Sequence, residues 1–210
     1  MTSDILLSYA DRLQNESMPP GKKKTLLAAV TLFAQQGFNG TSTAQLAQTA
    51  GVSQAAIFKY FKTKDDILQS ILEQSLPYLI QDFISELSQY SALTDIIHFT
   101  VFNRFAFIKQ NQEIIKIIFQ ELLVNPNLKT FIKSNFDNPT FSGQLKLFIE
   151  QLAANNPQFN KKLTLAEIIR IWVANLGSYF FQRFVLDIPT EDETADLTLI
   201  EQQIMTLLSS

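Results

Sequence analysis

A short turn at residues 50–53 constrains the fold of this chain more than any other feature. The segment 42–61 reads STAQLAQTAGVSQAAIFKYF and predicts a helix, a tight turn and a second helix. Gly51 suits the left-handed backbone of such a turn because it has no Cβ atom to clash, and Ser53 is a good N-cap for the second helix. Apolar residues can hold the two helices together, which predicts a compact helix-turn-helix unit: Leu46, Ala47, Val52, Ile57 and Phe61.

The charge around this unit is one-sided. Residues 22–64 hold six lysines and no acidic residue, while the whole chain has a formal net charge of −3. A basic segment on an acidic protein is the electrostatic footprint of a nucleic-acid-binding surface. A solvated lysine face would explain the run 22–24 taken alone. Beside the turn motif, contact with DNA phosphates explains it better.

The second helix of the unit is therefore expected to enter the major groove of DNA. Its outward side chains are predicted to read the bases, because glutamine can pair with adenine, lysine can reach guanine, and alanine allows close approach to thymine methyl groups. These residues are Gln54, Ala55, Ala56, Phe58 and Lys59. Contacts to the DNA backbone are expected from Lys22, Lys24, Thr41, Thr43, Tyr60 and Lys64, and Ser42 and Ser53 complete the predicted set.

The segment 32–68 resembles the N-terminal domain of TetR/AcrR-type transcriptional regulators. The matching motifs are a Phe-Ala-x-x-Gly-Phe helix end, a Thr-Ser-Thr helix start, the Ala-Gly-Val-Ser turn and a Tyr-Phe-Lys-Thr-Lys stretch. Phe58 stands where the family usually has tyrosine, so it offers no hydroxyl to a phosphate. The resemblance is close over about residues 22–70 and implies a three-helix head, followed by a helical domain for effector binding and dimerisation.

Apolar residues recur at helical spacing along almost the whole chain, which predicts an all-α fold. We expect an N-terminal extension over 1–21, a helix-turn-helix domain over 22–68 and a helical effector-binding and dimerisation domain over 69–210. Pro77 is expected to kink or divide the fourth main helix. The predicted helices outside the turn motif cover residues 3–14, 22–36, 63–89, 94–110, 112–124, 126–136, 139–154, 164–186 and 195–208.

The composition argues against several classes of protein. Without cysteine the chain cannot form disulfides or thiolate metal sites, and the single histidine, His98, cannot form a multi-histidine metal site. The apolar run 5–7 is too short for a signal peptide, and no stretch of 18 apolar residues occurs. We therefore expect a cytoplasmic protein that is not an enzyme and that needs neither a cofactor nor a metal.

Aromatic residues are concentrated in the second part of the chain. Fourteen of the eighteen phenylalanines, and the only tryptophan, follow residue 80. An ordinary core explains each phenylalanine taken singly. Because regulators of the TetR type hold small molecules among their C-terminal helices, the set also predicts an apolar ligand pocket with a few polar groups. Its expected lining is Phe102, Asn103, Phe119, Phe148, Trp172, Asn175 and Tyr179.

The last helix carries a narrow apolar seam. Leu197, Ile200, Ile204 and Leu207 are separated by three, four and three residues, a spacing typical of helices that pair along one stripe. A monomeric core is the simpler explanation. The resemblance and the need to read two half-sites favour a homodimer through residues 164–186 and 195–208.

Three functional hypotheses follow from these patterns. The first is a ligand-responsive regulator, a repressor, that binds a palindromic operator as a homodimer and is released by a small apolar effector. The second is a ligand-independent DNA-binding or architectural protein with a solid helical core. The third, an enzyme that uses His98, would require several carboxylates or hydroxyls close to that residue.

Overall fold

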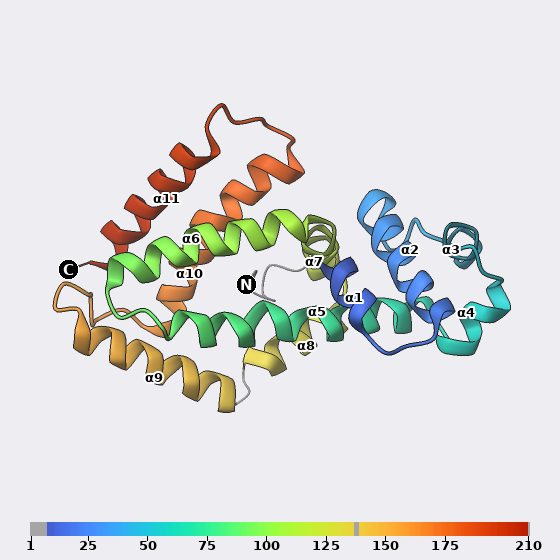
Figure 1. Cartoon of the computed structure of the whole chain (residues 1–210), viewed down its shortest axis with the longest axis horizontal. Coiled ribbons are helices and arrows are strands. Elements are labelled where there is room, and N and C mark those ends of the chain that lie inside the picture. Colours follow the sequence, from blue (N-terminus) through green and yellow to red (C-terminus); the bar gives the residue numbers. More distant parts are fainter. Residues whose placement is uncertain (1–7, 137–138, 210) are drawn as a thin grey trace. The chain divides into compact units, whose positions relative to one another are not determined.

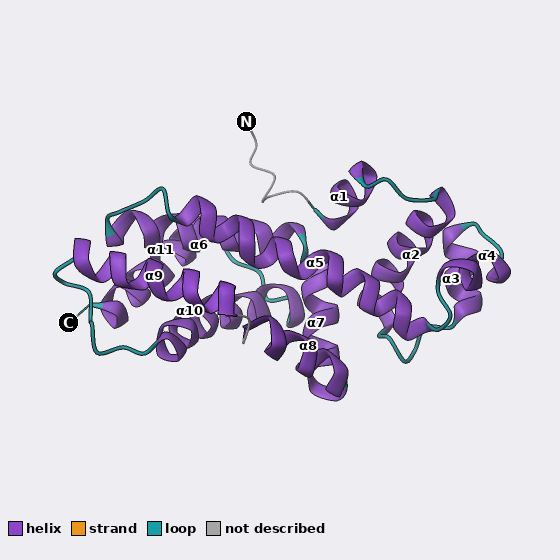
Figure 2. Cartoon of the chain, turned by 90° about the horizontal axis from the view of Figure 1, so that it is seen from below, coloured by secondary structure: helices purple, strands orange, loops and turns teal. Residues whose placement is uncertain are grey.

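The described part of the chain consists almost entirely of helices (Figures 1 and 2). The structure is a computed structural model that describes residues 8–136 and 139–209, without the side chains of 76–85, 135–136 and 140–141. Within these ranges the only β contact is an isolated bridge between Phe159 and Ser209. The predicted all-α fold is confirmed. None of the described helices combines the length and the apolarity needed to cross a membrane.

The observed helices agree closely with the predicted ones. α1 covers only part of the first predicted helix, whose residues 3–7 lie outside the described range. The helices are α1 (Tyr9–Asn15), α2 (Pro20–Gln36), α3 (Thr43–Ala50), α4 (Gln54–Tyr60), α5 (Lys64–Leu87), α6 (Leu93–Gln110), α7 (Gln112–Val124), α8 (Pro126–Phe136), α9 (Pro139–Asn155), α10 (Leu165–Phe180), the π-helical turn η2 (Phe181–Val185) and α11 (Glu193–Leu208).

Three prolines show how position decides what this residue does to a helix. Pro20 and Pro126 each begin a helix, where the missing N–H would have no intrahelical partner in any case. Pro77 was expected to kink or divide its helix. The helix is not divided: α5 runs without a break from Lys64 to Leu87.

The predicted helix 164–186 is α-helical only as far as Phe180 and ends in the wider π turn η2.

The chain forms two compact units, each of two segments. Unit 1 comprises residues 1–82 and 110–130, and unit 2 comprises 83–109 and 131–210. Unit 1 therefore includes α7, which the predicted division placed with the second domain. In unit 1, helix α2 packs against α1, α3, α4 and α7. Its side chains Leu26, Ala29 and Phe33 are completely buried.

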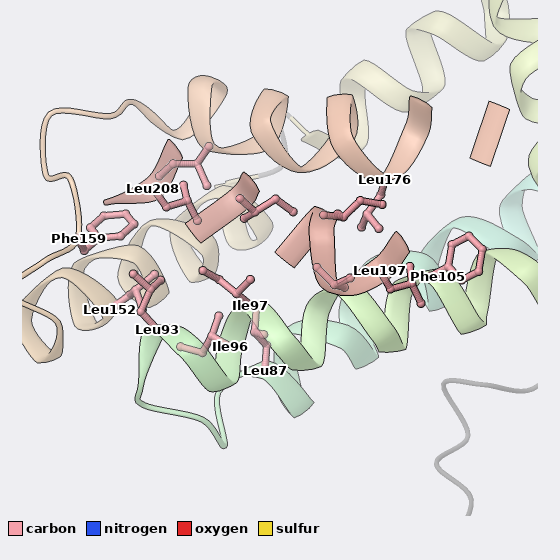
Figure 3. Packing of buried hydrophobic residues seen from close by; sticks show 14 of the residues in the cluster. Leu87, Leu93, Ile96, Ile97, Phe105, Leu152, Phe159, Leu176, Leu197 and Leu208 are labelled. Atoms are coloured by element: carbon pink, nitrogen blue, oxygen red, sulfur yellow. The ribbon is translucent and has the colours of Figure 1, made fainter. Parts of the chain in front are cut away.

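Unit 2 has a continuous apolar core (Figure 3). α6 contributes Ile97 and Phe105, α10 contributes Leu176, and α11 contributes Leu197 and Leu208. Phe159, in the connection between α9 and α10, reaches the same cluster and forms the β bridge with Ser209. Burial of this apolar surface is the main free-energy gain on folding of the unit.

Candidate DNA interface and ligand sites

The turn between α3 and α4 has the predicted backbone. Gly51 lies in the left-handed region, with φ 63° and ψ 38°. The N–H of Val52 donates to the carbonyl oxygen of Ala47 at 3.0 Å, so the end of α3 is closed by hydrogen bonds within the turn. Ser53 then caps α4, because its hydroxyl accepts from the N–H of Ala56 at 3.1 Å. These bonds set the direction in which α4 leaves the turn.

The start of α3 is fixed by a reciprocal pair of hydrogen bonds. The Ser42 hydroxyl accepts from the N–H of Gln45 at 3.2 Å, and the Ser42 N–H donates to the Gln45 side chain at 2.8 Å. This capping box satisfies donors that a helix end otherwise leaves unpaired. Ser42 was predicted to contact DNA, and in the structure its hydroxyl is engaged in the cap.

Burial separates an inner from an outer side of α4. Ile57 is buried, and so is Phe61, just after the helix; Leu46, Ala47 and Ala50 of α3, which packs against α4, are buried too. The residues predicted to read bases lie mainly on the outer side: Gln54, Ala55 and Lys59 are exposed, Phe58 is 48% exposed, and Ala56 is half-buried. The structure therefore leaves this side of α4 accessible to a partner.

Two side chains predicted to contact the DNA backbone make hydrogen bonds within the head. Thr41 is only 2% exposed, and its hydroxyl donates to the Gly37 carbonyl at 2.9 Å and accepts from Gln36 at 3.2 Å. The Lys64 ammonium donates to the carbonyl oxygens of Phe38 and Thr41, at 2.6 and 2.8 Å. These hydrogen bonds hold the short loop before α3 in place.

The remaining predicted backbone contacts differ in exposure. Lys24 is exposed, whereas Lys22, Thr43 and Tyr60 are half-buried. The Lys22 ammonium lies 5.6 Å from the centre of the Phe61 ring. Tyr60 packs closely on Gly21, where an added Cβ would lie 3.3 Å from its ring. Lys24 is thus the more accessible of the two lysines.

Comparison with known proteins identifies the type of DNA-binding domain that this head forms. Residues 26–71 match the family model described as "Bacterial regulatory proteins, tetR family". The N-terminal head of the chain is therefore a domain of the tetR type. Over 57 residues it is 39% identical to the transcriptional regulator YvkB of Bacillus subtilis, a match covering 27% of this chain and 30% of YvkB.

Other matches extend further along the chain. The match to YttP of Bacillus subtilis, at 25% identity, covers 55% of this chain and 56% of that protein, so the chain spans about a third to a half of the first two relatives. The fatty acid metabolism regulator protein of the same species is 23% identical over 72% of this chain and 83% of its own length. A FadR structure from Bacillus subtilis with stearoyl-CoA shares the fold, with a TM-score of 0.65 and 19% identity over 89% of this chain and 97% of FadR.

The polar groups predicted for an effector pocket already have partners in unit 2. The Tyr179 hydroxyl donates to Asp196 at 2.8 Å, and the Asn175 amide donates to the Ile171 carbonyl at 2.7 Å. Asn103 accepts from Arg104 Nε at 3.0 Å. Burial, together with the Asp196 hydrogen bond, raises the pKa of Tyr179 to about 12. Hydroxyl donation from Thr190 and then from Tyr179 lowers the pKa of Asp196.

The predicted apolar lining does not form one group in the structure. Phe102, Phe148 and Trp172 are partly buried against the core of unit 2. Phe119 lies on α7 in unit 1 and is 45% exposed. Three of the aromatic residues that suggested a pocket therefore pack against a core. The sequence could not show this, because helical periodicity does not distinguish a pocket wall from a core.

The predicted dimer seam is also largely part of that core. Leu197, Ile200 and Ile204 are at most 6% exposed and pack within unit 2, which leaves Leu207, at 50%, as the accessible member. The three buried residues pack within their own chain, because an a/d-like stripe serves equally well for such packing, and the dimer seam stays a prediction. Exposed apolar side chains of the same region lie elsewhere, at Val173, Phe181, Val185, Leu186, Ile188 and Leu199.

His98 lies on the surface of unit 2. Its side chain is 62% exposed, with Nδ1 3.2 Å from the carboxylate of Glu201 and its ring beside that of Phe102. Among the described residues, no group of three or more histidine, aspartate or glutamate side chains is placed to hold a metal ion. One carboxylate contact is less than the converging set that the enzyme hypothesis requires.

Proposed function

We propose that this protein is a cytoplasmic transcriptional regulator whose α3–α4 unit binds double-stranded DNA. The observation that carries the proposal is the outer side of α4, where Gln54, Ala55, Phe58 and Lys59 are exposed on a helix anchored by Ile57. The segment around it holds six lysines and no acidic residue. The match of residues 26–71 to the tetR family model supports the same function.

Salt dependence tests this proposal directly. Each phosphate neutralised by a lysine releases counterions, so the logarithm of the binding constant falls with the logarithm of salt concentration by roughly 0.9 per contact. We expect steep salt dependence in fluorescence anisotropy titrations, and a shallower slope for Lys24→Ala. Lys161→Ala, which removes an exposed lysine of unit 2, is the matched control and should leave the slope unchanged. Affinity that stays constant between low and moderate salt would exclude DNA binding by this head.

We also propose that the regulator is a homodimer on a palindromic operator. A helix-turn-helix dimer reads two half-sites about one helical turn apart. Unit 2 exposes apolar side chains on three neighbouring elements, among them Val173 (61%), Phe181 (48%) and Leu199 (53%). Their burial against a second copy would remove apolar surface from water.

The proposal includes release of the operator by a small apolar effector. FadR of Bacillus subtilis, which has the same fold, was crystallised with stearoyl-CoA. Phe102, Phe148 and Trp172 are only partly buried on the core of unit 2 and could repack around an acyl chain. Titration with stearoyl-CoA should change Trp172 fluorescence and lower operator affinity together. A change in neither signal would exclude this effector class.

Ligand-independent DNA binding is the second candidate function. The observation that favours it is the continuous core of unit 2, in which Leu176, Tyr179 and Ile204 are buried and the Tyr179 hydroxyl is already paired. A solid core lets the protein bind DNA without a response to ligand. If apolar ligands leave Trp172 fluorescence and operator affinity unchanged while DNA binding remains specific, this function is the correct one.

A further inference from the structure

The N-terminal helix α1 lies outside the residues 26–71 that match the tetR family model. It has seven residues and belongs to unit 1, together with the DNA-binding head. One side of it is docked, because Tyr9 and Leu13, four residues apart, are 6% and 1% exposed, whereas Ala10 and Gln14 are exposed. A helix this short is not stable on its own in water, so α1 forms because it docks.

A hydrogen bond fastens each end of α1. At its start, the Tyr9 N–H donates to the side-chain oxygen of Asn111 at 2.9 Å, and this bond is buried. At its end, the Lys23 ammonium of α2 donates to the Gln14 carbonyl oxygen at 2.9 Å, where the last turn of a helix favours a positive charge. α1 therefore connects α2, the first helix of the head, to the residue before α7.

Asn111 uses its side chain for α1 rather than for its own helix. It is 7% exposed and stands just after α6, where the chain passes from unit 2 to unit 1. Although it is the N-cap residue of α7, its side chain makes no capping hydrogen bond to that helix. Its oxygen instead accepts from the first N–H of α1, one of the donors that a helix start leaves unpaired. Asn111 thus caps a helix that begins 102 residues earlier in the chain.

The docked state of α1 also carries a cost. The Tyr9 hydroxyl is buried without a hydrogen-bond partner, whereas water would supply a partner to it in an undocked helix. An open pocket of about 660 Å³ between α1, α2 and the start of α7 shows that the packing around α1 is incomplete. The gain from burial of Tyr9 and Leu13 is therefore partly offset.

We propose that Asn111 is a positioning residue of the DNA-binding head, and that α1 is a clasp that releases without unfolding the rest of unit 1. The docked clasp holds α2 to the residue before α7, and α2 packs against both α3 and α4. A head held in this way loses less conformational freedom when DNA binds, so DNA favours the docked clasp. This effect on DNA rests on the proposed function, whereas release of the clasp does not.

Single cysteines in the full chain, which has none of its own, measure release of the clasp. Ala10→Cys is exposed on α1, Leu13→Cys lies on its docked side, and Leu26→Cys is fully buried in α2. A buried thiol reacts with N-ethylmaleimide only when its segment opens, so Leu13→Cys should react at least about tenfold more slowly than Ala10→Cys and about tenfold faster than Leu26→Cys. A rate equal to either reference overturns the proposal. Hydrogen exchange of the unsubstituted protein should give the same order for the amides of α1 and α2.

Substitutions added to Leu13→Cys should change its rate in opposite directions. Asn111→Leu removes the acceptor and should raise the rate about tenfold, whereas Asn111→Asp keeps an acceptor oxygen and should leave the rate nearly unchanged. Tyr9→Phe should lower the rate about tenfold, because the docked state no longer buries an unpaired hydroxyl. Tyr90→Phe, at a partly exposed tyrosine of unit 2, is the matched control. A higher rate for Tyr9→Phe, or an unchanged one for Asn111→Leu, contradicts the clasp.

DNA coupling is measured on a fragment selected from a random pool. The fragment should slow the reaction of Leu13→Cys but not that of Ala10→Cys. Leu13→Asp, which prevents docking, should weaken DNA binding by the same factor, because coupling between two equilibria is reciprocal. Circular dichroism checks that this variant keeps the remaining helices. If DNA binds but does not slow Leu13→Cys, Asn111 does not position the head. If no fragment binds, the proposed function fails, and the labelling rates alone decide on the clasp.

Discussion

The Lys64 ammonium donates to the carbonyl oxygen of Thr41 at 2.8 Å, so the first residue of α5 holds the loop that leads into α3. The same ammonium donates to the Phe38 carbonyl and lies 4.3 Å from the centre of the Phe38 ring. A lysine expected to contact a phosphate is therefore an internal support of the DNA-binding head.

Replacement of this support should destabilise the free protein. Lys64→Met should lower the free energy of unfolding by about 1–2 kcal/mol, because hydrogen bonds to two backbone carbonyls are lost. Urea denaturation followed by circular dichroism, without DNA, measures the change. Lys62→Met, at an exposed position, is the control. Unchanged stability of Lys64→Met together with weaker DNA binding would instead support a phosphate contact.

The exposed Lys59 should contribute to sequence preference. Lys59→Ala should cost about 1–3 kcal/mol at one base pair of each half-site, because a lysine that reaches guanine is lost. The measurement is a comparison of affinity for the operator and for a set of single-base variants. An equal loss on operator and on random DNA would identify Lys59 as a phosphate contact.

Two glutamate variants of α11, one at an exposed leucine and one at a buried isoleucine, distinguish an association surface from a core. Leu199→Glu places a charge at a 53% exposed position and should yield a folded monomer with weak operator binding. Ile204→Glu places a charge at a fully buried position and should unfold unit 2, at a cost of several kcal/mol. Analytical ultracentrifugation and circular dichroism distinguish the two. A dimeric Leu199→Glu protein would move the interface to another part of the surface.

The hydrogen bond from Tyr179 to Asp196 should make stability depend on pH at both extremes. The pKa of Asp196 lies below its ordinary 3.8, so its contribution is present above pH 3.8 and is lost as the pH falls below it. The pKa of Tyr179 is raised from 10.0 to about 12, so its contribution is present below pH 10.0 and is lost as the pH rises towards 12.

The variant Tyr179→Phe tests this dependence. The difference in unfolding free energy between wild type and variant should be constant at neutral pH and should shrink below pH 3.8 and above pH 10.0. Tyr90→Phe, at a 39% exposed position, should show no such profile. A difference that is the same at every pH would mean that only packing of the ring is lost.

Much of the fold follows from local sequence signals. The turn at Gly51, the capping residues Ser42 and Ser53, and the prolines at helix starts act over a few residues, so their effects can be inferred without knowledge of the rest of the chain. The inner residues Leu46, Ile57 and Phe61 follow from the same motif, because two short helices joined by a tight turn have few ways to pack. Lys59 and Phe58 lie on the side of α4 that does not take part in this packing, so their exposure could be predicted as well.

The sequence by itself therefore determined the all-α class, nearly all helix boundaries and the inner and outer sides of α4. Tertiary structure decided where longer-range contacts fall: it placed Ile204 in a core rather than on a seam, engaged Lys64 with Thr41, and left the Tyr9 hydroxyl buried without a hydrogen-bond partner. The physical reason is the distance along the chain between the residues that interact. Helix propensity and capping depend on neighbours in the chain, whereas burial and hydrogen-bond partners depend on residues distant in sequence, whose positions a periodic pattern does not specify.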